Sequence, residues 1–255
     1  MRLGTAQRVE GGRERRFLAS PLPADPGRLV DLQGVEAERL RKLGEGEPEA
    51  LAQALLPASL RRLLEAGPRG LQRARQALAY AEKWARRGTL PPSLAPTAED
   101  LKLLPCLPRP SSLRLPEGGY GDRLGLRGPG ARLPWTAGAS WRASLAVFGQ
   151  AGGRPAGFAL VLEAGSAAVL GAWMHTDIRL EGELELEARS GARRAPLAAW
   201  ADLELPPLRP GEVQLLPFPI WEPLPLLPGD RARLETPFDS LDARVDREGT
   251  HPTLQ

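Results

Sequence analysis

The sequence predicts an α+β protein in which a small N-terminal region of strands and helices precedes a larger, β-rich domain. Three observations support this. Helical spacing of apolar residues is confined to residues 51–87, short β-like runs recur between glycines and prolines after Ser111, and a proline-rich stretch separates the two. We therefore expect a small N-terminal domain at residues 1–100 and a β domain at residues 101–255.

The first stretch predicts two short strands, at residues 17–19 and 28–32. Both are apolar runs, and turn-forming residues occur at Gly11-Gly12 and at Pro26-Gly27.

The helical region follows. The leucines within residues 51–56 have helical spacing, and Pro57 ends that segment. A short helix is expected over residues 60–64. Residues 71–87 carry apolar side chains on one face and arginines on the other, which predicts an amphipathic helix that Gly88 caps.

Prolines dominate residues 89–110. Because proline fixes φ and has no N–H to donate, we expect this segment to be extended and to wrap around the fold rather than pair as a central strand.

Strands are predicted in the β domain at residues 144–148, 158–162, 180–188, 213–216 and 231–236. The segments 205–212 and 227–230 are each predicted to form a turn before the next strand. The segment 180–187, LEGELELE, alternates leucine and glutamate almost strictly, which indicates a strand with one solvated face. A solvated face explains its carboxylates better than a metal-ligand cluster does.

Composition excludes several classes of function. Cys106 is the only cysteine and His175 and His251 are the only histidines, so disulfides, thiolate clusters and multi-histidine zinc sites are excluded. The net charge is +3, but arginines are interleaved with acids and aromatic residues make up only 5%. Nucleic-acid binding is therefore not expected. The sequence has no apolar run of membrane-spanning length and no apolar N-terminal leader, so we expect a cytoplasmic protein.

Four segments occur in an order and spacing typical of one family. They are residues 103–111 (LLPCLPRPS), 208–213 (LRPGEV), 227–235 (LPGDRARLE) and 238–245 (FDSLDARV). The chain resembles the fumarylacetoacetate hydrolase family. The resemblance implies a mixed β-roll domain, preceded by a small N-terminal α/β domain, and commonly a homodimer.

The resemblance also shows which active-site residues are missing. In active members a Glu-x-Glu pair and an aspartate on the next strand bind Mg²⁺ or a similar ion. The corresponding positions here are Arg142, Ser144 and Glu163. A guanidinium cannot ligate a cation, so only Glu163 is a candidate metal ligand, and an Arg142–Glu163 ion pair is a hypothesis for the old metal position.

Other family features are lost as well. No histidine lies between Met1 and Trp173, so the His–Glu lid of active members is absent. The family's Thr-Gly-Thr-Pro loop is replaced by the apolar residues 215–221, LLPFPIW.

These losses favour a catalytically degenerate protein. It would act as a homodimer or as a subunit partner of an active relative, or it would bind a small carboxylate such as an oxo-acid through Arg142, Tyr120 and Trp221.

The alternative is an active hydrolase, decarboxylase, dehydratase or isomerase of a 2-oxo or β-diketo acid. It would need Mg²⁺ or Mn²⁺, held by Glu163 with Asp122 or Glu117, and His175 is the one candidate base in the β domain. A third hypothesis, nucleic-acid binding by the helix at 71–87, rests on charge alone.

Overall fold

The structure is a computed structural model, and it describes residues 1–114, 125–153, 155–200, 207–218 and 223–247. The chain begins with the hairpin β1 (Arg2–Glu10) and β2 (Arg13–Leu22). Gly11 and Gly12 join these strands with φ values of 55° and 78°. Positive φ at both positions matches the twist of a tight hairpin and is easiest for glycine, so this predicted turn is confirmed.

The strands of the N-terminal region are longer than the sequence predicted. Strand β1 was not expected, β2 contains the predicted run at residues 17–19, and β3 spans Asp25–Asp31. The turn predicted at Pro26-Gly27 is wrong, because the chain reverses at residues 23–24. Both residues lie within β3, at a register shift that interrupts its pairing with β2.

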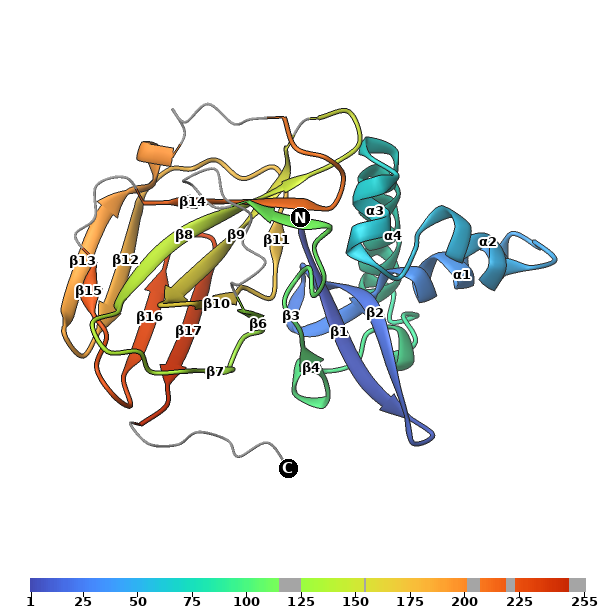
Figure 1. The fold of residues 1–255 in the computed structure, drawn as a ribbon. Coiled ribbons are helices and arrows are strands. Elements are labelled where there is room, and N and C mark those ends of the chain that lie inside the picture. Colours follow the sequence, from blue (N-terminus) through green and yellow to red (C-terminus); the bar gives the residue numbers. More distant parts are fainter. Residues whose placement is uncertain (115–124, 154, 201–206, 219–222, 248–255) are drawn as a thin grey trace.

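Four α-helices follow within the described residues: α1 (Leu32–Lys42), α2 (Pro48–Leu55), α3 (Leu60–Glu65) and α4 (Pro68–Arg86). The amphipathic helix predicted at residues 71–87 is α4, and Gly88 ends it with φ of 66°. The helices gather on one side of the N-terminal strands, away from the second sheet (Figure 1). None of the helices in the described part of the chain is long and apolar enough to cross a membrane.

The proline-rich segment wraps as expected. It contains the short 3₁₀ helices Pro92–Leu94 and Ala98–Asp100 and the two-residue strand β4 (Lys102–Leu103), which pairs with β1.

The larger sheet has twelve strands within the described residues, and eight of them follow the order β3-β2-β1-β11-β9-β8-β14-β5. Its β-domain strands are β5 (Ser112–Arg114), β6 (Gly125–Arg127), β8 (Ser140–Gly149), β9 (Pro155–Ala164), β10 (Ala167–Leu170), β11 (Met174–His175), β14 (Glu212–Pro217) and β15 (Leu224–Pro225). The antiparallel pair of β1 and β11 joins the N-terminal hairpin to this sheet.

The second sheet has the order β13-β12-β16-β17-β7 in the described residues. Its strands are β7 (Arg132–Leu133), β12 (Glu183–Ala188), β13 (Gly191–Pro196), β16 (Arg231–Glu235) and β17 (Ser240–Val245), and the 3₁₀ helix Leu197–Trp200 follows β13. The strand predicted at 180–188 begins only at Glu183, because Gly182 has φ of 93°. The leucines of β12 are buried, whereas its glutamates are exposed or half-buried, as the alternation predicted.

Alternate residues of β8 contribute to two different cores. Trp141, Ala143 and Leu145 pack against the second sheet. Ala146 and Phe148 point to the other face and pack with α3 and α4. Because side chains alternate along a strand, Arg142 and Ser144 belong to the same face as Ala146 and Phe148.

Candidate functional site

The candidate site lies on the Arg142 face of the large sheet, near the start of β8 and the end of β9. Arg142 is the direct cross-strand neighbour of Glu163, and Ser144 is paired with Val161, two residues away from Glu163. Since residues two apart share a face and paired residues point the same way, Arg142, Ser144 and Glu163 lie on one face. The family resemblance suggested these three positions as one site, and the strand register places them side by side.

Glu163 is hydrogen-bonded to Ser144, whose Oγ donates to its Oε1. Ser144 is fully buried, while Glu163 retains some exposure. Burial raises the pKa of Glu163, and the Ser144 hydrogen bond and the charge of Arg142 oppose that increase without cancelling it. This side chain is therefore a carboxyl that takes up a proton more readily than an exposed glutamate does.

The expected ion pair between Arg142 and Glu163 is replaced by the Ser144 hydrogen bond. Arg142 is exposed, and its charge acts on Glu163 from beyond ion-pair distance. Within the described part of the chain Arg142 forms no ion pair. Its guanidinium donors are therefore available to an anionic ligand.

Two hollows flank Arg142. One has a volume of about 160 Å³ and apolar walls; it is lined by Trp141, Arg142, Ala143, Pro217, Phe218 and Pro223. The other has a volume of about 210 Å³ and is more polar; it is lined by Gly138, Ala139, Ser140, Arg142, Glu163 and Gly165.

His175 lies in another part of the fold. It pairs with Phe158 on β9, which is five residues, roughly 17 Å along a strand, from Glu163. An odd spacing points the two side chains to opposite faces. His175 is 3% exposed, contacts Phe238 edge-on, and its Nε2 is 2.9 Å from Asp239 Oδ2. The one candidate base is thus a buried partner of the second sheet and does not meet Glu163.

The other residues proposed from the sequence cannot be placed. Tyr120 and Trp221 lie outside the described residues, as do Glu117 and Asp122.

Comparisons with known proteins concern the fold of nearly the whole chain. No protein-family model and no curated protein matches the sequence. Solved structures do match its fold. Maleylpyruvate hydrolase from Sphingobium sp. SYK-6 has a TM-score of 0.60 and 18% identity, and the match covers 97% of this chain and 100% of that one. The same enzyme in complex with manganese(II) and pyruvate has a TM-score of 0.56 and 16% identity, covering 97% and 99%.

A third structure, 5-carboxymethyl-2-hydroxymuconate delta-isomerase from Mycobacterium smegmatis, has a TM-score of 0.59 and 15% identity and covers 97% and 100% of the two chains. This chain has the fumarylacetoacetate hydrolase fold. The fold class predicted from the sequence motifs, α+β with a mixed β-roll, is confirmed.

Within the fumarylacetoacetate hydrolase fold, the described residues of the candidate site do not fit a divalent metal ion. Among the described residues, no group of three or more histidine, cysteine, aspartate or glutamate side chains is arranged to hold one. Mg²⁺ requires several oxygen ligands, whereas the described part of this site supplies one carboxyl, one hydroxyl and a guanidinium that repels cations.

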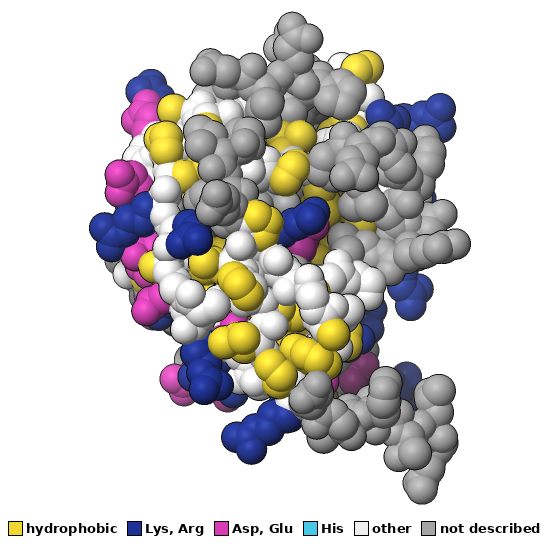
Figure 2. Space-filling view, turned by 60° about the vertical axis from the view of Figure 1, so that its left-hand side comes forward, with side chains coloured by type: hydrophobic (Ala, Val, Ile, Leu, Met, Phe, Trp, Pro, Cys, Tyr) yellow, Lys and Arg dark blue, Asp and Glu magenta, His cyan; other side chains and the backbone are white. Residues whose placement is uncertain are grey.

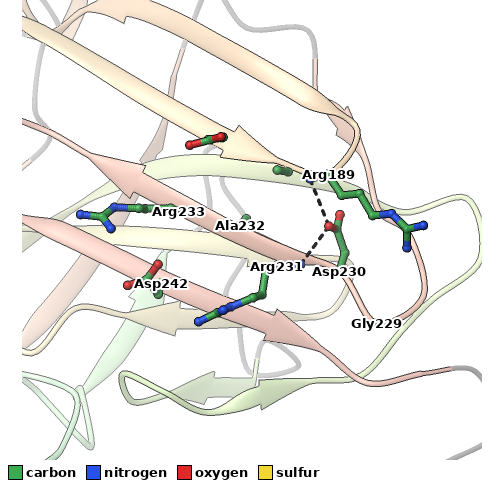
Figure 3. Close-up of a pocket in the computed structure, with 9 residues that line it drawn as sticks. Arg189, Gly229, Asp230, Arg231, Ala232, Arg233 and Asp242 are labelled. Atoms are coloured by element: carbon green, nitrogen blue, oxygen red, sulfur yellow. Dashed lines mark hydrogen bonds between the residues drawn. The ribbon is translucent and has the colours of Figure 1, made fainter.

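The acids of the two motif turns are structural. Asp230 of the LPGD turn is 1% exposed and accepts hydrogen bonds from the backbone N–H groups of Arg189 and Arg231, at 3.2 and 2.9 Å (Figure 3). Its other oxygen accepts from Trp141 Nε1 at 2.8 Å. A hollow of about 550 Å³ lies at this corner, and Arg231, Arg233 and Asp242, labelled in Figure 3, are among the residues that line it.

Glu212 of the LRPGEV turn has the same role at the other side of β8. It is 2% exposed and accepts from Arg209 N at 2.9 Å, Ser112 Oγ at 2.8 Å and Arg114 Nε at 2.7 Å. Sequence reasoning identified both turns but missed that their acids bind distant strands. The signal in the sequence is the acid that directly follows Pro-Gly in both turns.

Charge on the molecular surface is mixed rather than gathered into one patch on the face seen in Figure 2. There, basic and acidic side chains lie next to one another on the left side, and hydrophobic side chains lie mainly in the middle. On helix α4 the arginines also have acidic neighbours, as in the Arg73–Glu36 and Arg86–Glu82 pairs.

Proposed function

We propose that this protein is a catalytically degenerate form of the fumarylacetoacetate hydrolase fold that binds a small carboxylate, such as an oxo-acid, without metal-dependent turnover. The observation that carries the proposal is the shared strand face of Arg142, Ser144 and Glu163. At the positions where active relatives hold a cation, this chain offers an anion-binding guanidinium.

The lack of a histidine base in the described site supports the same proposal. General base catalysis needs an acceptor within hydrogen-bond reach of the substrate, directly or through one water. His175 is buried on the other face of β9 and is bound to Asp239. Burial strongly raises the pKa of Cys106, so its thiol is not a nucleophile at neutral pH.

The proposal extends to assembly in the cell. The protein acts as a homodimer or as a non-catalytic subunit beside an active relative.

The alternative is a metal-dependent enzyme acting on a 2-oxo or β-diketo acid. It is favoured by the manganese and pyruvate bound in a protein of similar fold. It would require Mg²⁺ or Mn²⁺ and ligands besides Glu163, from Glu117 or Asp122.

A thermal-shift titration separates the two. The purified protein is titrated with Mg²⁺ or Mn²⁺, each with and without oxalate or pyruvate. A ligand that binds only the folded state raises Tm with the logarithm of its concentration. We expect a shift with the oxo-acid alone, lost in Arg142→Gln and kept in the matched surface variant Arg179→Gln. A shift that requires metal would overturn the proposal in favour of the enzyme.

A gain-of-function variant sharpens this test. Arg142→Glu combined with Ser144→Asp places two new carboxyls beside Glu163, and the shorter aspartate suits the fully buried position 144. We expect Mn²⁺ at about 100 times its Kd to raise the Tm of this variant by about 5 °C and to leave the unmodified protein unchanged. Circular dichroism in the absence of metal checks that the variant is folded.

A further inference from the structure

The apolar hollow beside Arg142 arises where the edge of β8 changes partner. Strand β14 pairs with β8 as far as Pro217, opposite Ser144, and Phe218 N donates to Ala143 O at 3.1 Å. Strand β15 then pairs with Trp141 through Leu224. Between these two pairings the edge of β8 borders a hollow of about 160 Å³.

The walls of this hollow are held firmly. Trp141 is fully buried and its Nε1 is tied to Asp230. Phe218 is 6% exposed and packs edge-on against Trp200, with ring centroids 5.0 Å apart. The Trp141 and Phe218 side chains belong to the core that faces the second sheet, on the opposite side of the sheet edge from the Arg142 side chain. Pro217 pairs with Ser144 and so shares the Arg142 face, and Pro223 adds stiff apolar surface beside it. Apolar pockets with a few convergent polar groups are typical of preformed small-molecule sites.

Arg142 thus stands between two hollows of different character. Glu163 and Ser140 line the polar one, and no described residue of the apolar one carries a charge except Arg142 itself. A ligand with one anionic end and one apolar end matches this arrangement.

We propose that the ligand of this site is a monocarboxylic 2-oxo acid with a branched aliphatic or aromatic side chain. Its carboxylate binds the Arg142 guanidinium and its side chain fills the hollow between Phe218 and Pro223. The inference rests on the proposed function. A second carboxylate in the apolar hollow would be desolvated without a partner, so dicarboxylic acids are disfavoured.

Isothermal titration calorimetry tests this with four probes: pyruvate, 4-methyl-2-oxopentanoate, phenylpyruvate and 2-oxoglutarate, at one pH and ionic strength. We expect 4-methyl-2-oxopentanoate and phenylpyruvate to bind at least about 10-fold more tightly than pyruvate, because they bury additional methylene or ring carbons. The affinity for 2-oxoglutarate should be no higher than that for pyruvate.

Two variants locate the preference. Pro223 is exposed, so Pro223→Ser removes part of the apolar wall without touching the core, and it should reduce the preference for apolar acids while pyruvate binding changes little. Pro225→Ser is the matched control, an exposed proline of the same segment that does not line the hollow. Arg142→Gln should weaken binding of all four acids together.

The possible failures are distinguishable. If no probe binds the unmodified protein, the proposed function itself is overturned. If all four acids bind with equal affinity, or if Pro223→Ser leaves the preference unchanged, the carboxylate site stands and the apolar specificity is overturned.

Discussion

Asp230 is a carboxyl whose role depends entirely on its neighbours. It closes its own turn through Arg231 N, holds the end of β12 through Arg189 N and orients Trp141, which lies 89 residues earlier in the chain. Because Trp141 also lines the apolar hollow, this one side chain connects a family turn motif to the shape of the candidate site.

At the residue scale we expect Asp230→Ala to lower the free energy of unfolding by about 3 kcal/mol, because it leaves the buried Trp141 N–H and two backbone N–H groups without an acceptor. Asp242→Ala, at an exposed position, should change it by less than about 0.5 kcal/mol. Urea denaturation measures both. Equal losses of unfolding free energy for the two substitutions would show that the hydrogen bonds of Asp230 do not stabilise the fold.

At the scale of elements, Glu212 holds β5 against β14. Burial raises the pKa of Glu212, but hydrogen bonds from Arg209 N, Ser112 and Arg114 outweigh it and hold the pKa below its usual value. A carboxyl whose pKa is lowered by folding stabilises the protein above the pKa of the unfolded chain. That contribution is lost as the pH falls through the folded value.

Glu212→Gln should therefore destabilise the protein by about 2 kcal/mol at pH 7, since charge-assisted hydrogen bonds are replaced by neutral ones. The difference from the unmodified protein should shrink as the pH is lowered and Glu212 becomes protonated. Urea denaturation of both proteins at several pH values measures this difference in unfolding free energy. Glu235→Gln is the control, because the side chain of Glu235 is 58% exposed. A stability difference for Glu212→Gln that stays constant with pH would contradict the lowered pKa of Glu212.

At the scale of the whole molecule, one apolar core runs through the N-terminal helices and the β-roll. Leu63 and Leu64 of α3 are fully buried in the same cluster as Phe148 and Val213. The backbone is linked as well, because Ala151 N donates to Leu64 O at 3.0 Å. The domain boundary near residue 100 stays a prediction, and this shared core implies that the two parts unfold together.

Leu63→Ala should lower the free energy of unfolding by about 2–5 kcal/mol, the usual range for a buried leucine. Far-UV circular dichroism follows the helices, which in the described chain are N-terminal, and fluorescence follows tryptophans that are mostly in the β domain. Both signals should shift to the same new midpoint. A helical transition that separates from the fluorescence transition would mean that the two parts fold independently.

Much of the fold could be predicted from local patterns. Apolar periodicity located α4, alternating leucine and glutamate located β12, and the glycines at 11–12, 211 and 229 located turns whose φ values are positive. The strand β1 was missed, because a polar or glycine-containing run pairs only when its partner strand is present. The start of β12 was predicted too early, because the positive φ of Gly182 delays the strand to Glu183.

The sequence by itself pointed to the fold class and to the three positions of the candidate site, in both cases through motifs whose order resembles that of one family. Only the tertiary structure decided that Glu163 bonds to Ser144 rather than to Arg142, that His175 faces the second sheet, and that an apolar hollow adjoins Arg142. Such contacts depend on strand register and on packing between segments far apart in the chain, and no local pattern carries that information.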